Sequence, residues 1–279
     1  FIICENTPHI KCYYFAMGNT VVITSGKGGV GKTTVTASLG LALASRGVNT
    51  LLIDGDVGLN NLDVALGMEN RAAYDMADVM AGKCRVSQAI LQVPGYPLYI
   101  MPSAHAVYSE QIKAGDFRAL TGRLGGSFDY ILIDCPAGIE GGFHRAVSAS
   151  EYAIVVTTPH ISAVRDADKV VTLLSGYNLR GVSLIVNRVR GDLLARGETL
   201  EPREISRLLR YPLLGVIPED DGVAVCAQLG RPDMNESCSR AAFDMVAANM
   251  LTGEGGIYDP TLRYRGILGA IRSRLKKNA

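Results

Sequence analysis

Apolar residues along the chain gather in short continuous runs that are separated by longer stretches with helical spacing. The runs rich in β-branched residues lie at 21–24, 50–54, 98–102, 130–134, 152–157, 182–187 and 213–217. Most of them do not alternate with polar positions, which is typical of parallel strands that are buried on both faces. The pattern therefore predicts a sheet whose strands are mostly parallel.

Between the predicted strands, apolar residues recur at the spacing of amphipathic helices. These segments lie at 32–45, 72–81, 117–124, 163–176, 202–209 and 240–251. A regular alternation of strand and helix predicts a single α/β domain, doubly wound, with helices flanking the sheet. We assign this domain to residues 17–251 and expect 1–16, upstream of Met17, to be a non-native or disordered extension. The glycine-rich 252–261 stretch predicts a linker.

The first predicted strand is followed by a glycine-rich segment of the form G-x-x-x-x-G-K-[ST], which opens a predicted helix. Such a loop curls so that backbone N–H groups, the helix N-terminus and a lysine converge on phosphate oxygens, while the hydroxyl is offered to Mg²⁺. The glycines also spell G-x-G-x-x-G, the dinucleotide fingerprint, but that motif has no use for a lysine and threonine at the helix start. We predict an ATP site at Gly26, Lys27, Gly28, Gly29, Val30, Gly31, Lys32, Thr33 and Thr34.

Acidic residues end two of the predicted strands. Asp134 follows an apolar run and Asp54 another, with Asp56 two positions further on. A strand-end aspartate beside a phosphate loop can hold Mg²⁺, and a second acid can orient the attacking water. We therefore predict Thr33, Asp54 and Asp134 for the metal, with Lys32 and Asp56 as catalytic residues. The alternative reading of Asp54 is a helix cap.

The composition excludes a wholly disordered chain, and the net charge is the sum of two regions of opposite sign. With 48% hydrophobic and 20% charged residues, the chain can form a large core, and its six cysteines show no C-x-x-C pair. The formal net charge is +1 from 28 basic and 27 acidic residues. Residues 261–279 contain six of the basic residues and no acid, so the rest of the chain carries −5. A weakly acidic body with a cationic tail is typical of a protein that attaches by its tail.

The tail has an apolar stripe as well as its charge. On a helical wheel, Tyr264, Ile267, Leu268, Ile271 and Leu275 share one arc, with Arg272 and Lys276 opposite. Fifteen helical residues extend about 22 Å at 1.5 Å per residue, which is too short to span a bilayer but suits a helix that lies in its interface. We predict an amphipathic membrane-targeting helix at 262–279 that binds anionic lipid. Docking on the body and binding of nucleic acid are alternatives that the pattern alone leaves open.

Lys27, a second lysine early in the phosphate loop, resembles the signature of the deviant Walker A ATPases of the ParA/MinD family, and the strings 53–59, 134–140, 164–168 and 215–220 are similar to its MinD branch. The resemblance implies that Lys27 is a third catalytic residue, which reaches the nucleotide of a partner protomer, so that ATP drives homodimerisation. It also implies that Asn187 contacts adenine, that the loop of Pro218, Glu219 and Asp220 lines the base pocket, and that 165–168 is a surface for regulatory partners.

The same resemblance implies a Mg²⁺-dependent ATP hydrolase on the inner face of the cytoplasmic membrane that regulates placement of the division septum. The implied partners are the septum inhibitor MinC and an ATPase-activating MinE or its equivalent, with no nucleic acid. Two alternatives remain at this point. One is a ParA-type ATPase that partitions DNA, and the other is an iron–sulfur reductase of the same fold, for which Cys135 is the candidate ligand near the nucleotide.

Overall fold

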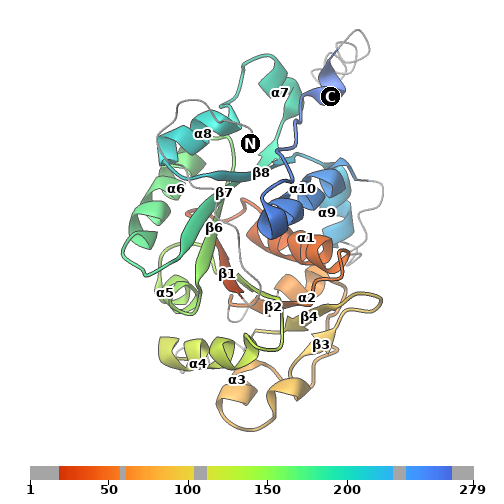
Figure 1. Ribbon diagram of the computed structural model, residues 1–279, viewed down its shortest axis with the longest axis vertical. Coiled ribbons are helices and arrows are strands. Elements are labelled where there is room, and N and C mark those ends of the chain that lie inside the picture. The colour runs from red at the N-terminus through yellow and green to blue at the C-terminus, as the bar shows by residue number, and fades with distance from the viewer. Residues whose placement is uncertain (1–18, 57–60, 104–111, 229–236, 266–279) are drawn as a thin grey trace.

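The computed structural model describes residues 19–56, 61–103, 112–228 and 237–265. Within these residues one twisted sheet has the order β3-β4-β2-β5-β1-β6-β7-β8, and every pair of neighbouring strands is parallel except β3 with β4 (Figure 1). The strands are β1 (Asn19–Thr24), β2 (Thr50–Asp54), β3 (Leu91–Gln92), β4 (Leu98–Met101), β5 (Tyr130–Asp134), β6 (Tyr152–Thr157), β7 (Gly181–Val189) and β8 (Leu213–Pro218). The predicted doubly wound α/β fold is confirmed.

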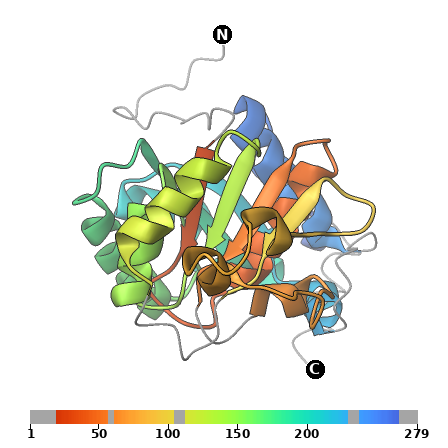
Figure 2. The same cartoon turned by 90° about the horizontal axis from the view of Figure 1, so that it is seen from below.

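Helices cover both faces of the sheet. One face packs against α1 (Lys32–Ala44), α2 (Asn61–Ala65) and α10 (Cys238–Thr252) in one hydrophobic cluster. The other face packs against α3 (Met76–Met80), α4 (Ala114–Leu124), α5 (Gly141–Ser148), α6 (Ile161–Leu174) and α8 (Pro202–Leu209). Figure 2 shows α4 and α10 on opposite sides of the strands. Because β1, β2 and β5 are fully buried, their side chains divide between the two clusters, which explains their continuous apolar runs.

Some elements differ from the sequence prediction. The helix expected at 72–81 begins only at Met76, because Asp75 accepts a hydrogen bond from the Asp78 backbone N–H and caps it. The short helices α2, α5, α7 (Gly191–Ala195) and α9 (Asp221–Gln228), and the edge strand β3, were not predicted. Of these, α2, α7 and β3 have at most five residues, which is too short to show a clear period in the sequence.

The predicted extension 1–16 lies outside the described residues, and the predicted tail helix 262–279 is described only as far as residue 265. Residues 1–18 and 266–279 lie outside the described residues, so Ile267, Leu268, Ile271, Arg272, Leu275 and Lys276 are not described. The 252–261 stretch, predicted as a linker, lies against the body, and Pro260 in it is buried. It leads to the 3₁₀ helix η3 (Leu262–Tyr264). Among the described residues, no helix combines the length and apolar character needed to cross a bilayer.

Candidate nucleotide site

The phosphate loop follows β1 and ends where α1 begins. Gly31, the residue before the helix, has φ 94°, a conformation that side-chain-bearing residues rarely adopt. No side chain caps the start of α1, so its first N–H groups remain open to a ligand. Lys32, the first residue of α1, is largely buried. The loop therefore has the geometry that the sequence predicted for binding phosphate.

Two predicted metal-binding acids lie side by side at the carboxyl edge of the sheet. Asp54 and Asp134 are register partners on β2 and β5, and both are buried. Burial and the charge of Asp134 raise the pKa of Asp54 to about 7. Burial also raises the pKa of Asp134 to about 6, against hydrogen bonding from Thr33 and Thr36 and the charge of Lys32. The raised pKa values of both carboxyl groups mean that the positive charge near this edge does not offset their burial and mutual repulsion.

These acids fit Mg²⁺ bound mainly through phosphate oxygens and water. Among the described residues, no group of three or more His, Cys, Asp or Glu side chains could hold a metal alone. Thr33, Asp54 and Asp134 instead offer oxygen donors beside the phosphate loop, which is the chemistry that Mg²⁺ prefers. A divalent cation would also relieve the repulsion between the two carboxylates. These three residues therefore fit Mg²⁺ either as some of its direct ligands or as acceptors for the water molecules bound to it.

Asp54 also performs the capping role that was its alternative interpretation. Its Oδ1 accepts a hydrogen bond from the Asp56 N–H at 2.9 Å, and its Oδ2 accepts one from the Leu62 N–H at 3.2 Å, at the start of α2. Asp56, the predicted catalytic acid, is only partly buried, and burial raises its pKa while Lys32 opposes that rise. The strand-end acid thus fixes the backbone that carries the second acid.

Thr36 was not among the predicted site residues. Its hydroxyl is buried one turn after Thr33 on α1 and lies 3.0 Å from the Lys32 carbonyl and 3.2 Å from Asp134 Oδ1. The spacing of Thr33 and Thr36 on one helix face was the available signal, because residues three apart share a face. Thr36 is therefore a positioning residue for the carboxylate of Asp134.

The four residues predicted around adenine do not all face an open site. Asn187 is buried, and its Nδ2 donates a hydrogen bond to the Val30 carbonyl at 2.8 Å, so the side chain ties β7 to the phosphate loop. Asp220 accepts hydrogen bonds from the backbone N–H groups of Gly222 and Ser239, at the starts of α9 and α10. The Pro218 carbonyl accepts from the Ser239 hydroxyl. Their contacts with adenine stay predictions.

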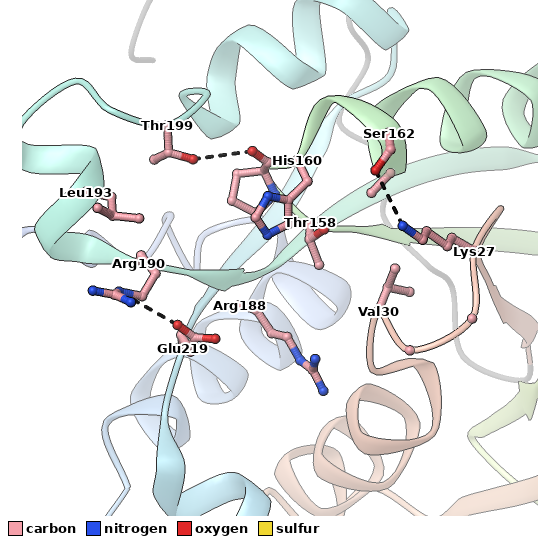
Figure 3. A pocket seen from close by; sticks show the side chains of 14 residues that line it. Lys27, Val30, Thr158, His160, Ser162, Arg188, Arg190, Leu193, Thr199 and Glu219 are labelled. Atoms are coloured by element: carbon pink, nitrogen blue, oxygen red, sulfur yellow. Dashed lines mark hydrogen bonds and ion pairs between the residues drawn. The ribbon is translucent and has the colours of Figure 1, made fainter. Parts of the chain in front are cut away.

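Glu219, the remaining member of that group, lines a cavity of about 410 Å³ beside the phosphate loop. Figure 3 shows Lys27 and Val30 on one side of the cavity, Arg190 and Glu219 on the other, and Arg188 between them. Arg188 has φ 54° where the pairing of β7 with β8 shifts register. Both arginines were missed, although their position within three residues of the end of the predicted strand 182–187 was a usable signal. Arg190 is paired with Asp192 and Glu219, so it is the charge of Arg188 that suits an anionic ligand such as a nucleotide.

Lys27, the signature lysine, lies at the rim of this cavity. Its Nζ donates a hydrogen bond to the Ser162 hydroxyl on the first turn of α6 at 3.4 Å, and both side chains are exposed (Figure 3). An exposed ammonium can reach a second molecule, but its contact with a partner's nucleotide stays a prediction.

A parallel sheet with this loop, a buried lysine and two strand-end acids defines a P-loop nucleotide-binding protein. Residues 21–232 match the family model described as the CobQ/CobB/MinD/ParA nucleotide binding domain. The putative septum site-determining protein MinD of Guillardia theta is 44% identical over 260 residues, which are 92% of this chain and 97% of the relative.

Solved structures agree with that relationship. MinD in the MinC:MinD complex of Aquifex aeolicus has a TM-score of 0.77 and 38% identity, over 85% of this chain and 96% of that one. MinD of Pyrococcus horikoshii, in complex with Mg-ADP, has a TM-score of 0.74 and 34% identity, over 85% and 98%. The chain belongs to the MinD/ParA family of P-loop ATPases, in its septum site-determining MinD branch.

This membership decides against the two alternatives from the sequence. ParA-type structures at 22% identity share the fold alone. Cys135, the candidate iron–sulfur ligand, is buried, and burial raises the pKa of its thiol to about 12. Among the described residues, no group of three or more His, Cys, Asp or Glu side chains is placed to hold a metal with it.

Proposed function

We propose that the protein hydrolyses ATP in a Mg²⁺-dependent reaction, dimerises when ATP is bound, and attaches reversibly to the inner face of the cytoplasmic membrane to regulate septum placement. The observation that supports this most directly is the arrangement of the phosphate loop beside the register pair Asp54 and Asp134. The N-terminus of α1 and Lys32 bind the phosphates of ATP. Mg²⁺ would neutralise charge on those phosphates, with Thr33, Asp54 and Asp134 as its protein donors.

Asp56 is the proposed catalytic acid of this site. Its partly buried carboxylate has a raised pKa, which makes it a better proton acceptor than an ordinary aspartate. It orients the attacking water or takes a proton from it. The hydrogen bond from the Asp56 N–H to Asp54 holds this residue near the strand end.

Membrane attachment is proposed to depend on dimerisation. One short amphipathic helix binds lipid weakly, whereas two on one dimer bind by avidity because the second insertion is intramolecular. Lys27 would join the protomers across the nucleotide, and hydrolysis would release them. The proposed protein partners are MinC, which the Aquifex aeolicus MinD structure contains, and a MinE-type activator. No binding of nucleic acid is proposed.

Two measurements test this proposal. The purified protein should release phosphate from ATP with Mg²⁺, and EDTA or Lys32→Ala should abolish that release. It should sediment with vesicles that contain phosphatidylglycerol in ATP but not in ADP, and Ile267→Glu should remove the binding. Equal sedimentation in both nucleotides would contradict the switch, and unchanged sedimentation of Ile267→Glu would contradict the tail as the anchor.

A further inference from the structure

Helix α8 carries exposed positive charge on one side. Ile205 and Leu209 are buried in the cluster on the face of the sheet opposite α1 and α10, and α8 lies beside α6 there (Figure 1). On the outer side of the helix, Arg203, Arg207 and Arg210 are exposed. Residues four apart share a helix face, and seven residues make about two turns, so these three side chains follow one line about 10 Å long. We call these three residues the arginine ridge.

The arginine ridge has no ion-pair partner among the described residues. Glu201 and Glu204, the acids at the start of the same helix, are exposed, and within the part of the chain that the structure describes neither forms an ion pair. Outside residues 261–279 the chain carries a net charge of −5. A cluster of three arginines on this surface is therefore contrary to the average charge of the body.

Two of the three arginines do not serve the stability of α8 itself. Arg203 lies in the first turn, where the helix dipole disfavours positive charge, and it repels Arg207 one turn later. Arg210 ends the helix with φ 60°, a left-handed conformation that glycine adopts more easily. Arg207, in the last turn, does suit the dipole. Residues that depart from local preference in this way are typical of functional surfaces.

An apolar side chain lies next to the arginine ridge. Leu208 is 63% exposed, and it directly follows Arg207 in the last turn of α8. We propose that the arginine ridge and Leu208 bind an acidic peptide segment of a partner protein. Guanidinium groups hold carboxylates through paired hydrogen bonds, and the exposed leucine offers a contact for an apolar side chain of the same segment.

The surroundings of the arginine ridge favour a peptide over a nucleic acid. A duplex presents evenly spaced phosphates, which would bring negative charge close to the exposed carboxylates of Glu201 and Glu204. A peptide presents separate carboxylates, which can contact the arginines and leave the two glutamates in water. Binding of phosphates also makes no use of Leu208, whereas a peptide can cover it. The ligand we infer is therefore a segment in which acidic and apolar residues are mixed.

The affinity for a defined peptide tests the arginine ridge in the whole chain. The probe is a fluorescein-labelled peptide of glutamate and leucine, with the leucines at helical spacing, and its control has glutamine in place of glutamate. We expect fluorescence anisotropy to show binding of the acidic peptide that weakens in about 0.5 M salt, where charges are screened, and no binding of the glutamine peptide. Binding of both peptides alike, or of neither, would overturn the inference.

Substitutions on two helices locate the contact. Arg203→Ala combined with Arg207→Ala should weaken binding of the acidic peptide about tenfold. The matched control is Lys113→Ala combined with Arg123→Ala, which removes two exposed cations at the ends of α4 and should leave binding unchanged. Because both substituted ridge arginines are exposed, Tm and ATP hydrolysis should stay as in the wild type. Equal weakening by the two double variants would contradict a site on α8.

Fluorescence distinguishes the arginine ridge from the cationic tail, because the chain contains no tryptophan. Leu208→Trp and Leu262→Trp each introduce a single fluorophore, at positions that are 63% and 59% exposed. The acidic peptide should shift the emission from position 208 to the blue and leave that from 262 unchanged. A shift at 262 that equals or exceeds the shift at 208 would place the peptide on the tail and overturn the inference. Equal affinity for the peptide and for duplex DNA would indicate a general polyanion surface and would also overturn it.

Discussion

Removal of the Arg190 side chain tests whether the ion pair between Arg190 and Asp192 holds α7 in place. Arg190 Nε lies 2.8 Å from Asp192 Oδ1, and Nη2 lies 2.7 Å from Oδ2, so the pair is bidentate. The Asp192 side chain is 1% exposed, whereas that of Arg190 is 34% exposed. Arg190→Ala would leave a buried carboxylate with only Arg196, whose Nη2 is 3.7 Å from Oδ2.

The expected loss is about 2–3 kcal/mol of unfolding free energy. Breaking a fully buried pair costs about 3–5 kcal/mol. We expect a loss below that range because Arg190 is partly exposed and Arg196 remains near the Asp192 carboxylate. For a chain of this size, that loss corresponds to a fall in Tm of about 4–12 °C.

The effect should also depend on pH. The hydrogen-bonded guanidinium of Arg190 holds the pKa of Asp192 below its usual value. A lowered carboxyl pKa contributes stability that is present above the unfolded pKa of about 3.9 and is lost as pH falls through the folded value. The difference in stability between wild type and Arg190→Ala should therefore be full at pH 7 and shrink below about pH 4.

The assay is thermal or urea unfolding of the nucleotide-free protein, with Arg180→Ala as the control. Arg180 pairs with Glu151 at 3.2 Å on the surface, where both side chains are exposed, and its loss should cost less than about 1 kcal/mol. A double-mutant cycle with Asp192→Asn should give a coupling of at least about 1 kcal/mol. If Arg190→Ala lowers Tm no more than Arg180→Ala does, the pair does not stabilise α7.

Three shorter predictions address other contacts. Asn187→Ala removes the buried hydrogen bond to the Val30 carbonyl and should cost about 1–2 kcal/mol; ATP titration should show weaker binding, and unchanged affinity would contradict a role in holding the loop. Thr36→Val removes a donor to Asp134 and should raise the Mg²⁺ concentration for half-maximal ATP hydrolysis, whereas an unaltered Mg²⁺ curve would show that the hydroxyl does not position the acid. Gly191→Ala should displace the chain at Pro260 and speed tryptic cleavage after Arg263 and Arg265, compared with Gly115→Ala, whose Cβ would meet open space.

The sequence alone determined the nucleotide-binding loop and the class of fold. The loop motif, the helix that it opens and the strand-end positions of Asp54 and Asp134 are encoded within a few residues each, so they can be recognised without tertiary contacts. The continuous apolar runs indicated a parallel sheet for the same reason, since a strand that is buried on both faces has apolar residues at successive positions.

Tertiary structure decided which residues meet. Asn187 and Val30 are 157 positions apart, and only the neighbouring ends of β7 and the phosphate loop join them. Asp220 was predicted to line a base pocket, and only the tertiary structure shows that its carboxylate also accepts hydrogen bonds from backbone N–H groups at the starts of α9 and α10. The 252–261 stretch looked like a linker because glycine-rich sequence is typical of one, yet the absence of a side chain at Gly191 lets it dock on α7. Such contacts depend on how segments far apart in the sequence pack against one another, and the local pattern of apolar and polar residues does not determine that packing.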